Sequence, residues 1–218
     1  MGWANKLVGW SSGNGAEVNV ENSLKVVSVS PSGAHYSLSA KTGTIAAAAA
    51  AGAAVFAMRV NPGYGGKIYL DSMKLRWTTI AAFTTPITQT RSLVITRGAG
   101  AASSGGTSLA TAVKKDTIYG ASQTDVATGG DTRIATTGAL TVTGITFETV
   151  NFEELTLAHV GSAGNFYEHV FEFTNRAHPI ELNAGEVIAV RVGASAMDAA
   201  GTWSLGIKLD WHESTTEA

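Results

Sequence analysis

Apolar and polar side chains alternate with a period of two residues along most of this chain. The clearest alternation lies near its end and places on one face Trp203, Leu205, Ile207, Leu209 and Trp211. Because successive side chains of a strand point to opposite faces, this segment predicts a strand that closes a sheet core. The same signal predicts strands at Leu24–Val29, Tyr36–Lys41, Val55–Val60, Ile68–Trp77, Ser92–Thr96, Arg133–Ala135, Leu140–Thr143, Ile145–Phe152, Asn165–Thr174 and Glu186–Val192.

Short strands with turn signals between them, and no long amphipathic helix, predict an all-β fold, either jelly-roll-like or a β-sandwich. One strand has on one face Tyr69, Asp71, Met73, Leu75 and Trp77, and on the other Ile68, Leu70, Ser72, Lys74 and Arg76. We therefore expect Asp71 at a rim or paired with a base. The alanine run Ala46–Ala51 predicts a turn or a brief helix. The Gly-, Ala- and Ser-rich segment Arg97–Thr107 predicts a mobile loop.

The start of the chain differs from the rest. Trp3, Leu7 and Trp10 recur at i, i+4 and i+7, which would align them along one side of a short helix. We predict an N-terminal arm or attachment segment at residues 1–23, followed by a single β domain at residues 24–218. Two interpretations of the arm stay open. Its tryptophans pack onto their own domain, or Trp3, Leu7 and Trp10 form an anchor that docks onto another subunit.

Composition narrows the classes of partner. The chain has 15 basic and 17 acidic residues, a net charge of -2 and 15% charged residues. It lacks the clustered lysines and arginines that neutralise a phosphate backbone, so we expect no direct nucleic-acid partner. The low content of charged residues favours a surface that is partly covered by other subunits. We expect a homo-oligomer, with a trimer favoured, because closed assembly protects sheet edges.

Neither a secretory signal nor a membrane-spanning segment is expected. Residues 1–10 lack an apolar core and a small-residue cleavage site. The weakly apolar run Ile45–Met58 is too short to cross a bilayer. The chain has no cysteine, which excludes disulfides and thiolate metal sites. We expect a soluble protein made in the cytoplasm, without a membrane partner.

The densest titratable cluster lies on the strand predicted over Asn165–Thr174. His169 shares a face with Tyr167 and two phenylalanines, which favours a core or rim histidine held by a hydrogen bond over a ligand or a base. Glu168 and Glu172 lie about 13 Å apart along such a strand. That separation exceeds the one between the carboxyl groups of a glycosidase. A solvated or interfacial acidic stripe is therefore favoured.

Histidine and serine spacings give no motif for chemistry. His159, His178 and His212 have no ligand partner at i+2 or i+4, so they could join a metal site only by tertiary convergence. The Gly-x-Ser-x-Gly pattern occurs only at Gly9–Gly13, in a Ser- and Gly-rich break of the arm and not at the strand-to-helix turn of a nucleophile elbow, and no phosphate-binding Gly-x-x-x-x-Gly-Lys loop occurs. We expect a protein that is not an enzyme, that needs no cofactor or metal, and that folds without a bound ion.

Several stretches resemble segments of bacteriophage virion structural proteins: Lys74–Thr84, Asp131–Thr141, His178–Leu182 with Gly185–Glu186, and Trp203–Glu213. The start of the chain, at Gly13–Asn19 and Asn22–Val26, is similar to a leader that precedes different bodies in phage structural proteins. The resemblance implies a virion location, other virion proteins as partners and an attachment role for the leader. Head, neck and tail stay open.

Two functions follow from the resemblance. One is a capsid decoration or cement protein that docks through its N-terminal arm on the major capsid protein or on neck or tail proteins, and that self-associates. The alternative is a host-recognition module that binds carbohydrate, in which exposed Tyr64, Tyr119 or Trp77 would stack on sugar rings. Exposed aromatic residues around one concave face would favour the second function.

Overall fold

The computed structural model describes residues 33–83, 91–157, 163–173 and 180–214, together with the strand positions of three short segments before residue 33. The chain divides into two compact units, Met1–Gly33 and Ala34–Ala218. In the first unit, β1 (Leu7–Val8), β2 (Gly15–Val18) and β3 (Leu24–Lys25) form an antiparallel sheet. The strand expected from Leu24 thus pairs within the first unit.

The helix predicted through Leu7 is wrong at that residue. Leu7 pairs with Ala16 across β1 and β2. Three apolar residues within ten positions are too short a segment to hold a helix without tertiary support, so strand pairing prevails. The side chains of Trp3, Leu7 and Trp10 lie outside the described residues, and their role as an anchor stays a prediction.

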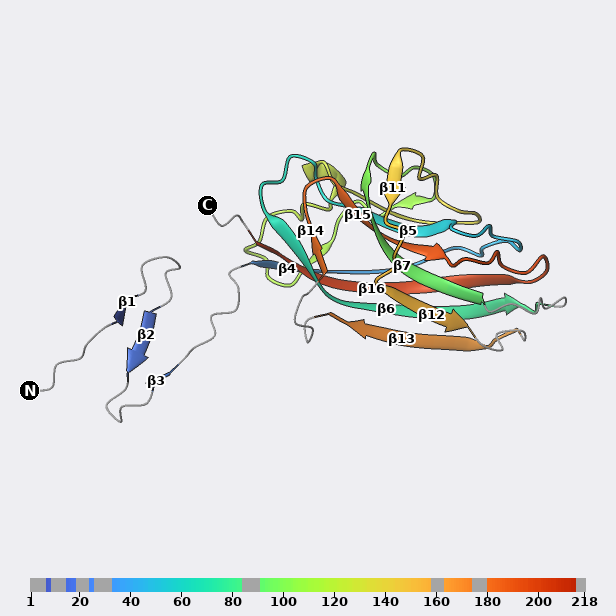
Figure 1. The fold of residues 1–218 in the computed structure, drawn as a ribbon, viewed down its shortest axis with the longest axis horizontal. Helices are drawn as coiled ribbons and strands as arrows, with labels where there is room; N and C mark the ends of the chain where they lie inside the picture. The colour runs from blue at the N-terminus through green and yellow to red at the C-terminus, as the bar shows by residue number, and fades with distance from the viewer. Residues whose placement is uncertain are drawn as a thin grey trace, which may run out of the picture. The chain divides into compact units, whose positions relative to one another are not determined.

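The second unit is a β-sandwich, which confirms the all-β fold class (Figure 1). One sheet has the order β11 (Ile145–Phe147), β7 (Arg91–Gly100), β15 (Glu186–Val192), β5 (Ala54–Arg59), β10 (Asp131–Ile134) and β8 (Thr107–Ser108), with β12 (Glu153–Leu157) also paired to β7. The other has the order β13 (Phe166–Glu172), β6 (Lys67–Ala81), β16 (Thr202–Ser214), β4 (Ala34–Lys41) and β9 (Val113–Lys114), with β14 (Ile180–Leu182) also paired to β6. All these pairings are antiparallel, and within the described residues the only helical element is a 3-10 turn at Val126–Thr128.

The core lies between the facing sides of the two sheets. Its largest fully buried side chains are Tyr36, Ile45, Phe56, Met58, Ile68, Leu70, Met73, Leu75, Trp77, Phe173, Trp203 and Trp211. The Trp77 and Trp203 rings stack with their centroids 4.2 Å apart. The alternation predicted for the last strand is confirmed, because Trp203, Leu205, Ile207, Leu209 and Trp211 all point into this core.

The face assignment predicted for Ile68–Trp77 is wrong for its first half. Ser72 pairs with Asp210, but Trp211 pairs with Leu70, so Asp71 is an extra residue on β6. This β-bulge changes the parity of the strand. Ile68 and Leu70 are therefore buried on the same side as Met73, Leu75 and Trp77. The side chain of Asp71 joins the outer face of the sheet instead.

Two predicted boundaries shift for identifiable reasons. The loop predicted over Arg97–Thr107 begins later, because β7 continues to Gly100 and pairs with β11. A Cβ at Gly98 would come within 2.8 Å of the Phe147 ring, so glycine permits this close pairing. The strand predicted over Leu140–Thr143 is reduced to one bridge at Thr141. The alanine run forms no helix and ends in a turn.

Candidate functional site

The outer face of the six-stranded sheet brings two histidines and a carboxylate together from three neighbouring strands. His35 lies on β4, His212 on β16 and Asp71 on β6, and His212 is the register partner of His35. Asp71 Oδ1 lies 2.8 Å from His212 Nδ1, and Asp71 Oδ2 lies 4.0 Å from His35 Nδ1. One ligand atom of each residue lies within 4.8 Å of those of the other two. We call these three residues the His–Asp–His cluster.

Neighbouring groups orient the cluster. The Tyr69 ring stacks on the His212 ring with centroids 5.0 Å apart and planes 13° apart, and Tyr69 is also the register partner of His212 on β6. The His35 and His212 rings lie 5.3 Å apart. The β-bulge carries Asp71 toward both rings, in line with the tendency of bulges to redirect a side chain. The cluster is thus held by strand pairing rather than by a loop.

The contacts within the cluster are unequal. The 2.8 Å separation between Asp71 and His212 is a hydrogen bond, whereas 4.0 Å between Asp71 and His35 is too long for one. The side chains of His35, Asp71 and His212 are 33%, 19% and 14% exposed, so solvent reaches all three. Imidazole nitrogens and carboxylate oxygens are ligands for transition-metal ions.

The next position along the same face is an ion-pair network. Asp210 lies 2.9 Å from Lys115 Nζ and 3.2 Å from Lys208 Nζ, and it accepts a hydrogen bond from Ser72. Burial acts to raise the pKa of Asp210, but the hydrogen bonds and charges of the two lysines together outweigh burial and lower that pKa. Asp210 is therefore an ionised partner of these lysines.

On the inner side of β16, Glu213 is a buried carboxylate. It accepts hydrogen bonds from Ser122 Oγ at 2.5 Å, from the Gln123 backbone N–H at 2.9 Å and from Trp211 Nε1 at 3.2 Å. Burial raises the pKa of Glu213, although these donors act in the opposite direction. Burial also raises the pKa of Asp125, which accepts hydrogen bonds from the backbone N–H groups of Ala112, just before β9, and Ser122, in the loop after it. Glu213 thus ties the loop before β10 to β16, and Asp125 ties the same loop to the residue before β9.

The edge of the six-stranded sheet at β13 carries exposed apolar side chains. Phe166 is 63%, Tyr167 41% and Val170 44% exposed. Among the described residues, β13 pairs with β6 alone, so its other backbone edge has no strand partner there. A seven-residue strand with a free edge and apolar side chains is a surface suited to pairing with another chain.

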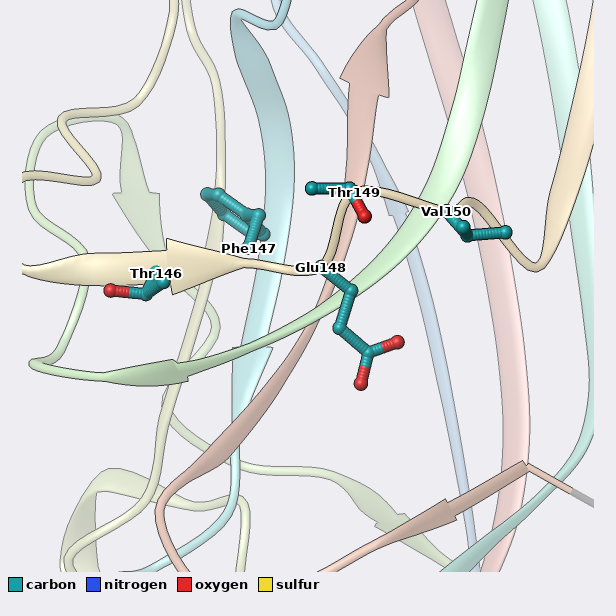
Figure 2. Close-up of a pocket in the computed structure, with 5 residues that line it drawn as sticks. All are labelled: Thr146, Phe147, Glu148, Thr149 and Val150. Carbon is teal, nitrogen blue, oxygen red and sulfur yellow. The ribbon is translucent and has the colours of Figure 1, made fainter.

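A shallow hollow lies beside β11, lined by Thr146, Phe147, Glu148, Thr149 and Val150. Figure 2 shows Phe147 and Glu148 pointing to opposite sides of the chain. Both are engaged in local contacts: Arg191 lies 4.2 Å over the Phe147 ring, and Glu148 pairs with Arg97. The hollow is open and lined by side chains from one short segment, so it offers no convergent set of polar groups.

The titratable residues predicted on the strand over Asn165–Thr174 lie on β13. His169 is exposed at the rim of the sheet rather than in the core, with its ring edge-on to Phe171 at 4.5 Å. β13 is an edge strand, so its inward side is only partly covered by the other sheet. Glu168 pairs with Lys74 at 2.7 Å, and Glu168 and Glu172 both face solvent, as expected for a solvated stripe.

The three aromatic residues suggested for sugar stacking are buried or partly buried. Trp77 is fully buried against Trp203. Tyr64 is half-buried and donates its hydroxyl to the Ser214 carbonyl at 2.8 Å, and burial together with Glu213 raises its pKa to about 12. Tyr119 packs against the core and faces Tyr36. The expectation of an exposed stacking ring is wrong for Trp77, and Tyr64 and Tyr119 are only partly exposed.

Sequence reasoning reached part of the cluster. It allowed His212 a metal site only by tertiary convergence, and His212 indeed meets His35 and Asp71 through the fold. It expected Asp71 at a rim or paired with a base, and Asp71 bonds to His212. It missed His35. The sequence signal for His35 is its position just before the buried Tyr36, since the alternation of the strand turns its side chain to the outer face. His159 and His178 lie outside the described residues.

A comparison of the sequence with known protein families matches none of them, and a comparison with curated proteins finds no similar chain. Within the residues that the structure describes, no helix has the length and apolarity needed to span a membrane.

Proposed function

We propose that this chain is a non-enzymatic structural component of a bacteriophage particle, a capsid decoration or cement protein that self-associates and contacts other virion proteins. The sequence resemblance supplies the virion setting, with the arm as the docking segment. The observation that supports a structural role is the edge of β13, whose outer backbone has no strand partner among the residues that the structure describes and which exposes Phe166, Tyr167 and Val170.

The β13 edge suits contact between subunits more than it suits solvent. Edge strands of stable monomers are usually protected by lysine, proline, bulges or a covering loop. On β13 the outward charges are the glutamates, and Glu168 is already paired with Lys74. Antiparallel addition of another strand would satisfy the free backbone groups and bury the three apolar side chains. A closed homo-oligomer, with a trimer favoured, is one arrangement that protects this edge.

Light scattering on the purified chain tests self-association. We expect an oligomer at micromolar concentration and a shift toward monomer in Val170→Lys, which places a charge at the edge. Val150→Lys is the matched control, because Val150 is 75% exposed and belongs to the loop between β11 and β12 rather than to β13. A monomeric native chain, or equal effects of both variants, would contradict assembly through this edge.

Cryo-electron microscopy of particles from the phage that encodes this chain tests the virion role. We expect density for the β-sandwich at regular positions on the particle. Purified particles that lack the chain altogether would refute the proposed function.

A further inference from the structure

We propose that the His–Asp–His cluster binds one divalent transition-metal ion of the Zn²⁺ type on the outer face of the six-stranded sheet. This site goes beyond the structural role proposed above. It rests on the geometry of His35, Asp71 and His212 and not on any sequence motif.

The separations fit such an ion. Zn²⁺ binds imidazole nitrogen and carboxylate oxygen at about 2.0–2.2 Å, which puts tetrahedral ligand atoms about 3.3 Å apart. The 2.8 Å and 4.0 Å separations in the cluster lie on either side of that value. All three ligand atoms lie within 4.8 Å of one another, so side-chain rotations that lengthen the Asp71–His212 contact and draw His35 inward would place them around one ion. The fourth position would be open to water or to a ligand from another molecule.

The strands hold the ligands in advance. Direct register pairing fixes His212 beside His35, and stacking on Tyr69 restrains the His212 ring. Asp71 directs one oxygen toward each histidine from the bulge. Such preorganisation reduces the entropy that is lost when an ion binds. An ion here would connect β4, β16 and β6.

The charges around the cluster are compatible with a cation. The lysines nearest along the face, Lys115 and Lys208, are paired with Asp210. Lys67, at the start of β6, is paired with Glu181 at 2.8 Å. The Asp71 carboxylate therefore faces the two histidines. Lys67 is balanced by Glu181, whereas Lys115 and Lys208 share the one carboxylate of Asp210, which draws both ammonium groups to itself.

Calorimetric titration of the metal-stripped full chain with Zn²⁺ tests the site. We expect one ion per chain. His35→Ala and His212→Ala should each weaken binding by at least about 10-fold, since even partners of metal ligands contribute about that much. The exposed His169 lies on β13, away from the cluster, so His169→Ala is the matched control and should bind as the native chain does. Absence of binding, or equal weakening in His169→Ala, would overturn the proposal.

A measurement on the native chain avoids dependence on the folding of any variant. Nitrogen-detected NMR of histidine side chains with added Zn²⁺ should shift the ring signals of His35 and His212 and leave those of His169 unchanged. Co²⁺ in place of Zn²⁺ should give the visible absorption of a four-coordinate site. Shifts confined to other histidines would show an adventitious ion only and would overturn the assignment.

Discussion

The stacked pair of Trp77 and Trp203 gives the most direct test of the sandwich core. Both rings are fully buried, their planes lie 14° apart, and Phe83 stacks beside Trp77 at 6.3 Å. Replacing Trp203 by alanine would remove the ring that joins β16 to β6 and leave a cavity between the sheets. The surrounding strands are held by pairing on both sides of β16, so they can collapse only partly into that space.

The expected loss of stability is large for one substitution. Truncation of a buried tryptophan to alanine costs about 3–5 kcal/mol, and an aromatic pair contributes about 0.5–1.5 kcal/mol beyond its buried area. We therefore expect a loss of about 4–5 kcal/mol for Trp203→Ala. For a domain of this size, each kcal/mol shifts the melting temperature by about 2–4 °C, so the midpoint should fall by about 8–20 °C.

Urea unfolding and calorimetry on the native chain and the variant measure this loss. Val150→Ala, at an exposed position, should change stability by less than about 0.5 kcal/mol. A double-mutant cycle with Trp77→Ala should give a coupling energy of at least about 0.5 kcal/mol, because the two rings are in contact. A loss below about 1 kcal/mol for Trp203→Ala, or additive effects in the cycle, would refute the packing described for this pair.

The remaining predictions concern a buried acid, the arm and a tight turn. Burial raises the pKa of Glu213, so the folded chain keeps this proton to higher pH than the unfolded chain. The free energy of unfolding should therefore fall as pH rises from about 4.5 to the raised pKa. Urea titrations at several pH values should show a smaller fall for Glu213→Gln. Deletion of residues 1–22 should leave the circular dichroism and melting temperature of the sandwich unchanged but abolish incorporation into particles. Trp10→Ala should lower incorporation without a large shift in melting temperature. A large melting shift with normal incorporation would contradict the anchor role of the arm. Gly106→Ala should destabilise the folded chain by about 1–3 kcal/mol, because φ at Gly106 is +56° and a Cβ there would lie 2.2 Å from the Ile134 carbonyl oxygen. In the control Gly138→Ala the new Cβ has no atom within 4 Å, so the melting temperature should not change.

The period-two signal predicts the fold class because it reflects burial, and burial decides most strand faces in a sandwich. It succeeds for the strand ending at Trp211, where every alternate side chain enters the core. It fails at Asp71, because a bulge adds one residue and reverses the parity before it. A bulge depends on pairing with β16, which is more than a hundred residues away, so local pattern cannot place it.

The candidate site was less predictable than the fold. His35 and His212 are far apart in the sequence and meet only because β4 and β16 pair in one register. No short sequence spacing between histidines indicates that His35 and His212 lie side by side. The exposed edge at β13 was also hidden, since its apolar residues resemble those of a strand buried on one face.

The position of β16 has a consequence for synthesis on the ribosome. β16 lies between β6 and β4, yet it is the last strand of its sheet in chain order. Until it emerges, β4 has no β16 to pair with and β6 lacks its long partner, so the nascent chain presents two apolar strand edges. Folding of this sheet therefore waits for β16 and is rich in long-range contacts, which slows it. A chain that stops before Thr202 would expose those edges permanently and should aggregate.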